Sequence, residues 1–576
     1  MITRTTAYQA NRCKPPCNGA ALSSVFALLV YCTPLSQHDA AASDHDQHTR
    51  GAPANVTFVR IDRTAYADRL RGFWLGANIA NWTGLPTENV KAEPPFFTDD
   101  DWGRAVGRNG ETIDFVLNSD PWGADDDTDI EYVYQAAMTR LNTHVLSAEQ
   151  IADAWQRHID LPLLWVSNLA ALGQMQHGRL PPATSLPENN PMWEMIDAQL
   201  TTEIFGALAP GRPDVALEMA GLPIRTTAYL HSAWAAEFYV IMHALAATAD
   251  ADLPRHEQLR FMADQARKRI PDWSYVADMY DFVKADFDRN PDKTDWESTR
   301  DKLYRRYQLD GTAGYTYRYP WDAGINFGAS IVSLFYGQGD YRKTVRIGTL
   351  AGWDSDNPTA TWGGLLGLMM GHRALTEYFG QRSFSDHYQI SRTRVGFARE
   401  PDTFTHMATR GLAVIDRMVV GAGGRIDANQ WHIPTMPREI VAEPSVPVTV
   451  PWVTIEDSDP RWQYTGFKTH ERLWNASGAT LTKGNAGCEA RITLGASAIQ
   501  LYAYRSDTSG SIEVSINDGP ATRVSLQTNA SPNGQYYAKV YARDDLDPGR
   551  HTLHIRCADD DASKNIDMLS IIPATE

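Results

Sequence analysis

Two short acidic clusters hold the residue types best suited to chemistry in this chain. Each stands directly before an apolar pattern of helical period, and the members are Asp125, Asp126 and Asp127 in the first and Asp354, Asp356 and Asn357 in the second. Acidic residues in a first helical turn complement the helix dipole and often do nothing more. One cap needs only one side-chain oxygen, however, and adjacent carboxylates repel one another unless a cation lies between them. The spacing therefore indicates a hard-cation site, with a solvated helix start as the alternative.

The choice of cation follows from the ligand atoms. Carboxylate and amide oxygens suit Mg²⁺, which usually keeps several waters. The chain has no paired His/Cys pattern of the kind that binds zinc. We therefore expect Mg²⁺ if the two clusters meet.

The elements that must position the clusters are predominantly helical. Residues 60–440 show apolar residues at helical spacing, most clearly in residues 148–172, 192–208, 227–247, 294–307 and 325–334. Residues 441–451 contain three prolines among valines and read as a stiff linker. From residue 452 to 576 the apolar period changes to two, with turn signals between short runs. We expect one large all-α region followed by a β-sandwich.

Composition limits the classes of ligand. A chain of 576 residues is too long for one core, and 43% hydrophobic residues indicate globular material. The formal charge of −17 argues against a dominant nucleic-acid surface, because binding phosphates needs concentrated Lys and Arg. A neutral or sugar-like ligand is easier to accommodate.

The N-terminus has the order of a secretory signal. Basic residues are followed by an apolar stretch at residues 20–31 and by three alanines at residues 40–42. The apolar stretch is too short for a permanent membrane span. We expect a signal peptide at residues 1–42, a disordered leader at residues 43–59 and an exported protein. Lipid attachment at Cys32 is a weaker alternative. The mature chain then keeps Cys488 and Cys557, either as one disulfide or as two free thiols.

Five separated motifs resemble, in the same order, those of the ADP-ribosylglycohydrolase family, over roughly residues 60–380. One motif combines residues 125–128, which contain the first acidic cluster, with residues 350–367, which contain the second. The others lie at residues 68–77 with 84–88, at 196–211, at 230–232, and at 325–328 with 336–339. Residues 455–460, 464–466 and 548–553 more diffusely resemble galactose-binding-like jelly-roll modules of secreted glycan-active enzymes.

The family resemblance implies an all-α fold and a centre of two Mg²⁺ ions, with Mn²⁺ as a substitute, that holds a ribose diol during glycosidic hydrolysis. By the same resemblance, Asp126, Asp127, Asp354 and Asp356 are metal carboxylates, and Asp127 belongs with Glu88 to the catalytic set. Glu88 matches a loop glutamate that orients water or gates the site. Asp125 and Asn357 stand at metal positions where the family usually has hydroxyl residues, and Asn81 replaces a common aspartate. His231 matches a substrate-loop histidine, with a core or cap position as the alternative.

Three functions remain open at this point. The first is an exported Mg²⁺-dependent hydrolase that cleaves an N- or O-linked ribosyl bond of the ADP-ribosyl type. The second keeps the metal chemistry but acts on pentofuranose-containing glycans or glycosides, which the export signal and the β module favour. The third is a catalytically silent carbohydrate-binding protein, suggested by the departures at Asp125, Asn81 and Asn357. We expect a ribosyl or furanosyl small molecule or glycan as the ligand.

Overall fold

The computed structural model describes residues 57–574, except residues 124, 392–394, 398–400, 436–438, 443–451, 474–475, 529–533 and 559–561. The predicted signal peptide, nearly all of the predicted leader and most of the predicted linker lie outside the described residues. Among the helices that are described, none combines the length and the apolar character needed to cross a membrane.

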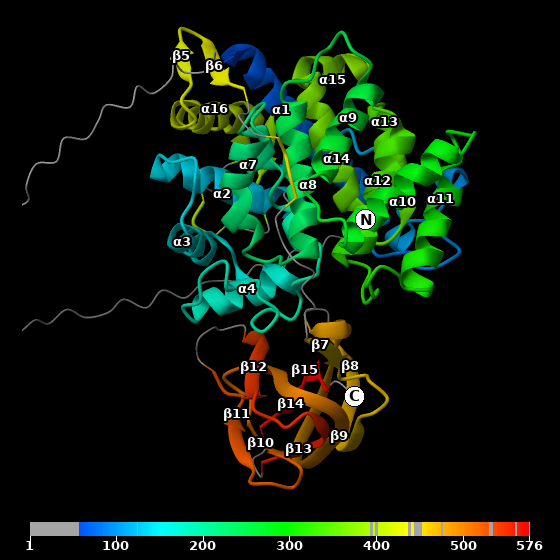
Figure 1. Cartoon of the computed structure of the whole chain (residues 1–576), viewed down its shortest axis with the longest axis vertical. Helices are drawn as coiled ribbons and strands as arrows, with labels where there is room; N and C mark the ends of the chain where they lie inside the picture. Colours follow the sequence, from blue (N-terminus) through cyan, green and yellow to red (C-terminus); the bar gives the residue numbers. More distant parts are fainter. Residues whose placement is uncertain are drawn as a thin grey trace, which may run out of the picture. The chain divides into compact units, whose positions relative to one another are not determined.

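The first region is helical, as predicted, and forms the upper part of Figure 1. Its helices are α1 (Arg63–Gly84), α2 (Asp126–Leu141), α3 (Ala148–His158), α4 (Val166–Gln176), α5 (Asp197–Leu200), α6 (Ile204–Ala207), α7 (Pro213–Ile224), α8 (His231–Ala246), α9 (Arg255–Arg267), α10 (Tyr275–Arg289), α11 (Trp296–Leu303), α12 (Ala323–Gly337), α13 (Tyr341–Ala351), α14 (Asp356–Met370), α15 (His372–Tyr378) and α16 (Phe404–Gly421).

Glycines set the distance between α1, which carries Asn81, and α14, which carries Asp356 and Asn357. A Cβ placed on Gly76 would lie 2.3 Å from the carbonyl oxygen of Gly363, and one on Gly367 would lie 2.1 Å from that of Gly72. The two backbones are therefore in direct contact along several turns. A Cβ on Gly84 would lie 2.5 Å from the Cα atom of Asp356, so the last turn of α1 lies beside the first turn of α14. Figure 1 shows where the two helices lie in the helical region.

Two small sheets flank the helices. One has the order β1 (Phe58–Asp62), β6 (Gln430–Pro434) and β5 (Arg425–Asp427), and the other joins β2 (Trp122–Gly123), β3 (His387–Gln389) and β4 (Asp402–Thr403). Strand β1 corrects the predicted leader, which was expected to extend to residue 59. Phe58 and Val59 already pair with Pro434 and Ile433, so order begins earlier because a distant strand supplies backbone partners.

The predicted helix at residues 192–208 is wrong as a continuous element. Only two single-turn helices, α5 and α6, form there. The hydroxyls of Thr201 and Thr202 donate to backbone carbonyls of α5, at 2.9 and 2.7 Å. Such local side-chain bonds compete with continuation of a helix. The predicted helix at residues 148–172 is likewise divided into α3 and α4, with Pro162 between them.

The C-terminal region is rich in strands, as expected. It contains β7 (Val453–Glu456), β8 (Gln463–Arg472), β9 (Thr480–Arg505), β10 (Ser511–Ile516), β11 (Thr522–Ser525), β12 (Gln535–Arg543), β13 (Gly549–Cys557), β14 (Lys564–Ile566) and β15 (Met568–Pro573).

The strand pairing of this region refines the prediction of a β-sandwich. The strands form one hydrogen-bonded sheet, because the long strand β9 pairs with β8, β13 and β14 through its first part and with β12 and β15 through its last part. One strand thus belongs to both halves, which share an apolar core that includes Ile492, Leu501 and Ile555. Cys488 and Cys557 form a disulfide, which decides between the two alternatives left by the sequence.

Candidate metal centre

The two acidic clusters predicted from the sequence converge. Asp127, in the first turn of α2, accepts a hydrogen bond at Oδ2 from Asn81 Nδ2 at 2.8 Å. Its Oδ1 accepts one from Asn357 Nδ2, in the first turn of α14, at 3.3 Å. Asn81 Nδ2 also lies 3.5 Å from Asp356 Oδ2. Two amides, one from α1 and one from α14, therefore hold the first cluster against the second.

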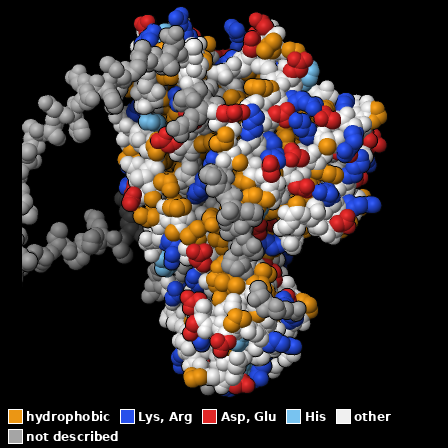
Figure 2. Space-filling model, viewed as in Figure 1, with side chains coloured by type: hydrophobic (Ala, Val, Ile, Leu, Met, Phe, Trp, Pro, Cys, Tyr) orange, Lys and Arg blue, Asp and Glu red, His pale blue; other side chains and the backbone are white. Residues whose placement is uncertain are grey.

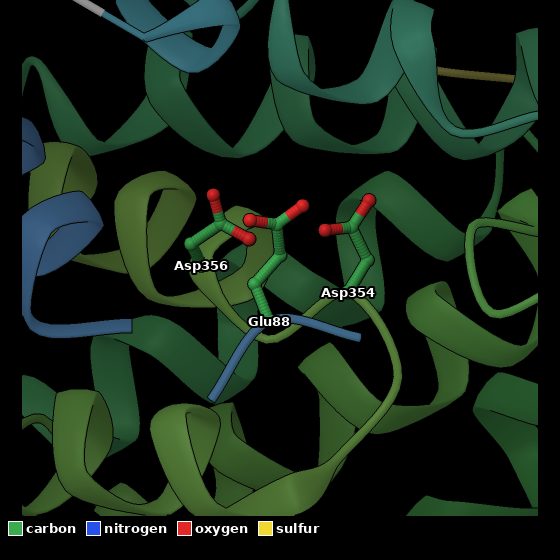
Figure 3. A group of neighbouring side chains, drawn as sticks. All are labelled: Glu88, Asp354 and Asp356. Atoms are coloured by element: carbon green, nitrogen blue, oxygen red, sulfur yellow. The ribbon is translucent and has the colours of Figure 1, made fainter. Parts of the chain in front are cut away.

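Each cluster brings three carboxylates together. Oxygens of Asp125, Asp126 and Asp127 lie within 4.8 Å of one another, and so do oxygens of Glu88, Asp354 and Asp356. Figure 3 shows the second group, with Glu88 reaching from the loop after α1 toward the two aspartates. The loop glutamate and the two aspartates of the second acidic cluster thus form one group.

Because these carboxyls are buried, ionising them without a nearby cation is costly. Asp127 is 5% exposed and Asp356 is 3% exposed. Burial first, and then the neighbouring carboxylates, raise the pKa values of Asp127, Asp354 and Asp356 well above the ordinary range of an aspartate. A bound cation would favour the ionised forms instead. This group of buried carboxyls therefore favours the binding of a cation.

The uncompensated oxygens test whether a metal fits. Asp356 Oδ1 and Asn357 Oδ1 are buried, and neither has a hydrogen-bond partner among the residues that the structure describes. Buried oxygens of this kind are costly unless something binds them. All the candidate ligand atoms are oxygens, which is the donor set that Mg²⁺ prefers. The residues present therefore fit a magnesium ion.

The backbone around the second cluster is unusual. Gly352 has φ 102° and Trp353 has φ 57°, so the chain enters the cluster through two residues with positive φ. This conformation is costly for a tryptophan and persists only where contacts impose it. One such contact is a hydrogen bond that the backbone amide of Asn89 donates to the carbonyl of Trp353 at 2.8 Å. The backbone amide of Asp354 donates to Asn326 Oδ1 at 3.1 Å.

Each acidic cluster lies at the start of a helix. Asp125 caps α2 by accepting from the amide of Asp126. Helix α14 begins at Asp356, directly after Ser355. Asp126, Asp127, Asp356 and Asn357 therefore lie inside first turns. The positive end of each helix dipole therefore faces the carboxylates.

Glu88 is held at the edge of the site. The guanidinium of Arg108 donates to Glu88 Oε2 at 2.8 Å and to its carbonyl oxygen at 2.7 Å. The side chain of Glu88 is 24% exposed, unlike the buried aspartates. Thr87 anchors the same loop by donating to the carbonyl of Thr349 at 2.6 Å. Glu88 thus lies between solvent and the buried oxygens.

His231 occupies a different environment. It is the first residue of α8, its ring stacks on Tyr275 with centroids 4.1 Å apart, and Trp273 and Trp234 approach it edge-on. Burial lowers the pKa of His231 to about 4, so the ring is neutral at pH 7. Its described contacts do not include either acidic cluster. The predicted substrate contact at His231 remains a prediction.

Some residues of the site escaped sequence reasoning. Asn326 lies inside the motif at residues 325–328, but its position in the sequence does not predict a hydrogen bond to residue 354. Arg108 belongs to none of the sequence motifs, and only the folding of its loop brings it into contact with Glu88. Trp353 and Trp362, which flank the second cluster in the sequence, are both fully buried and belong to the core.

Comparisons with known proteins identify the family of this chain. A family model described as ADP-ribosylglycohydrolase matches residues 62–392, more than half of the chain. The chain belongs to the ADP-ribosylglycohydrolase family. Among solved structures, an ADP-ribosylglycohydrolase-related protein complex matches with 15% identity and a TM-score of 0.37, covering 62% of this chain and 99% of the other.

The other matches fall on smaller parts of the chain. A family 35 carbohydrate binding module from Clostridium thermocellum matches with 13% identity and a TM-score of 0.17, covering 21% of this chain and 98% of the other. A family two carbohydrate esterase from Cellvibrio japonicus matches with 18% identity and a TM-score of 0.16, covering 22% of this chain and 36% of the other. No curated protein matches this member of the ADP-ribosylglycohydrolase family.

Proposed function

We propose that this chain is an exported, Mg²⁺-dependent glycoside hydrolase that cleaves an N- or O-linked ribosyl bond. Membership in the ADP-ribosylglycohydrolase family supports hydrolysis of a glycosyl bond. The observation that carries the metal dependence is the buried junction of the two acidic clusters through Asn81 and Asn357. Export rests on the order of residues in the first 42 positions.

The proposed chemistry divides between the ion and the chain. Bound Mg²⁺ would act as a Lewis acid and lower the pKa of a water molecule. Asp126, Asp127, Asp354 and Asp356, with Asp125 and Asn357, would hold it. The amides of Asn81 and Asn357 orient Asp127 by donating to both of its carboxylate oxygens. Arg108 pairs with Glu88 and directs its carboxylate, so that Glu88 can accept a proton from water at the mouth of the site.

A furanosidase acting on pentofuranose-containing glycans is the second candidate. It keeps the same metal site and the same roles for Glu88 and Asp127. The strand-rich C-terminal region and the expected export signal favour it, because a glycan outside the cell is available to an exported enzyme. The catalytically silent carbohydrate-binding alternative is tested by the same experiments.

Metal binding is tested first, by unfolding the purified chain with and without Mg²⁺ or Mn²⁺. A ligand at about 100 times its Kd stabilises the folded state by about 2.7 kcal/mol. We expect this gain in the wild type and its loss in the double variant Asp126→Ala with Asp354→Ala. Without metal the double variant should be no less stable than the wild type, because it loses two repelling carboxyls.

The chain offers a matched control for this experiment. Asp99, Asp100 and Asp101 form another run of three aspartates, but none of them is buried. Asp100→Ala should therefore keep the full gain from Mg²⁺. If the wild type gains nothing from either ion, the silent-protein alternative replaces the hydrolase.

The substrate is tested next with two panels. Release of ADP-ribose from modified arginine and serine peptides is compared with cleavage of aryl α- and β-furanosides. Activity that Glu88→Gln lowers on the peptides supports the ribosyl proposal. Activity on the furanosides alone assigns the enzyme to the second candidate.

A further inference from the structure

A basic groove lies in the C-terminal region, and its lining includes no residue of the metal centre. It has a volume of about 630 Å³ and is lined by residues of β10, β11 and β12 and the segments beside them. Strands β11 and β12 each end a row of paired strands, and Figure 1 shows them on the same side of the region. The groove thus follows the edge at which the curled sheet is open.

The floor and the rim of this groove differ in chemistry. Ile516, Val524, Val540 and Tyr541 contribute an apolar floor and are partly packed against the core of the region. The other lining side chains include four cations, namely Arg505, Arg523, Lys539 and Arg543. No Asp or Glu lines the groove. A ligand here would meet apolar surface below and positive charge along its sides.

Two of these cations have no ion pair. Arg543 pairs with Asp545, and Lys539 interacts with the carboxylates of Glu188 and Asp544, whereas Arg505 and Arg523 form no ion pair among the residues that the structure describes. Arg505 donates to the carbonyl oxygen of Gln527 at 2.9 Å, and its Nε is buried without a partner in the described part of the chain. Lys539 also donates to a backbone carbonyl. The guanidinium groups of Arg505 and Arg523 therefore remain available to an anion.

The surroundings make this concentration of charge distinctive. The whole chain has 70 acidic and 53 basic residues. Figure 2 shows acidic and basic side chains intermixed over the face of the helical region. Many other arginines are paired, as Arg461 is with Asp459 and Arg556 with Glu489. A groove that gathers cations and excludes carboxylates concentrates positive potential in an otherwise acidic protein.

We propose that this groove binds an anionic polysaccharide, with uronic acid residues as the charged units. Guanidinium groups bind carboxylates through paired hydrogen bonds, which makes arginine the appropriate side chain. The ring of Tyr541 and the aliphatic floor suit the apolar faces of sugar rings. The volume falls within the range of about 300–1,000 Å³ that holds a compact ligand, and so admits a few rings at a time. A nucleic acid is less suited, because four cations are few for a phosphate backbone and the chain as a whole is acidic.

The test measures binding of the full-length chain to polygalacturonate and to its methyl-esterified form, by affinity electrophoresis and calorimetry. The esterified polymer keeps the sugar and removes the charge. We expect binding to the acid form, weaker binding to the ester, and loss of affinity as NaCl is raised from about 0.05 M to about 0.5 M. Dextran sulfate is included as an alternative source of anionic groups, and binding to it in place of polygalacturonate would assign sulfate as the charged unit.

Two pairs of arginines provide matched variants. Arg505→Gln with Arg523→Gln removes two charges from the groove, whereas Arg491→Gln with Arg550→Gln removes two from exposed positions outside it. The groove pair should raise the Kd by about tenfold or more, since hydrogen bonds to charged groups are lost. The control pair should leave the Kd unchanged. Arg523→Gln alone, on the exposed strand β11, serves if the double variant does not fold.

Several results would overturn the proposal. Equal binding of the acid and ester polymers would remove the role of charge. Equal losses in the two variant pairs would show a general charge effect. Tighter binding of duplex DNA than of any polysaccharide would replace the polysaccharide with a nucleic acid. None of these outcomes depends on hydrolysis, so the hydrolase proposal and the groove proposal can fail separately.

Discussion

Restoring an aspartate at Asn81 should weaken the metal-free protein and strengthen its response to magnesium. Asn81 Nδ2 lies 2.8 Å from Asp127 Oδ2 and 3.5 Å from Asp356 Oδ2. In Asn81→Asp, a donor to two carboxylates becomes a third buried carboxyl beside them. The new group can avoid ionisation by taking up a proton. The cost of doing so sets an upper limit on the loss of stability.

The magnitude follows from the pKa of an ordinary aspartate, about 3.9. Each pKa unit corresponds to about 1.36 kcal/mol, so keeping the new carboxyl protonated at pH 7 costs at most about 4 kcal/mol. At pH 5.5 the same calculation gives about 2 kcal/mol. The folded pKa of the new carboxyl is raised, so the folded state binds the extra proton and the loss grows as pH rises. We expect a metal-free loss of about 2–4 kcal/mol at pH 7 that shrinks at pH 5.5.

Mg²⁺ should stabilise the Asn81→Asp variant more than it stabilises the wild type. A cation between the clusters stabilises the ionised form, so the third carboxylate becomes a further ligand or a neutralising neighbour. The variant should bind Mg²⁺ at least about tenfold more tightly than the wild type, which corresponds to about 1.4 kcal/mol. Urea unfolding at several Mg²⁺ concentrations, with calorimetric titration, measures both quantities.

Asn78→Asp supplies the control in the same helix. Asn78 is also 1% exposed, but its amide donates to the carbonyl of Trp74 and not to the acidic clusters. This variant should lose stability through burial of a carboxyl and regain none with Mg²⁺. Equal rescue of both variants, or no additional rescue of Asn81→Asp, would refute the assignment of this junction as the metal site.

Three further outcomes test the surrounding fold. Gly367→Ala should cost about 1–3 kcal/mol or more, because the new Cβ would meet a backbone carbonyl of α1 at 2.1 Å, whereas Gly173→Ala, with open space around it, should not destabilise α4 in urea unfolding. Burial lowers the pKa of His243 from 6.5 to about 4. The unfolded chain therefore takes up this proton first, and the wild type should lose up to about 3 kcal/mol as pH falls from 6.5 toward 4. His243→Gln should flatten that part of the stability curve, and an unchanged slope would contradict the argument. Reduction of the Cys488–Cys557 bond, which closes a separation of 69 residues, should destabilise the strand-rich region by about 2–4 kcal/mol, measured by near-UV circular dichroism with and without a thiol reductant.

Local sequence patterns were sufficient to predict the fold class of both regions and the positions of the acidic clusters. Apolar periodicity predicted a helical region followed by a strand-rich one, because a period near 3.6 or of 2 reflects which face of an element is buried. The acidic clusters at residues 125–127 and 354–356 were predicted at helix starts, since carboxylates before an apolar stripe are a local signal. Their ligand type followed from side-chain chemistry. The family resemblance predicted that the two clusters belong to one site.

Tertiary structure decided what lies between those elements. The amides of Asn81 and Asn357 reach Asp127 across 46 and 230 positions of sequence, and Arg108 reaches Glu88 only through a folded loop. The glycine contact between α1 and α14 and the cations around the C-terminal groove likewise join residues from separate elements. Periodicity records the burial of each element but not its partner. Distances between side chains on different elements depend on packing of the whole chain, and so only the folded protein determines them.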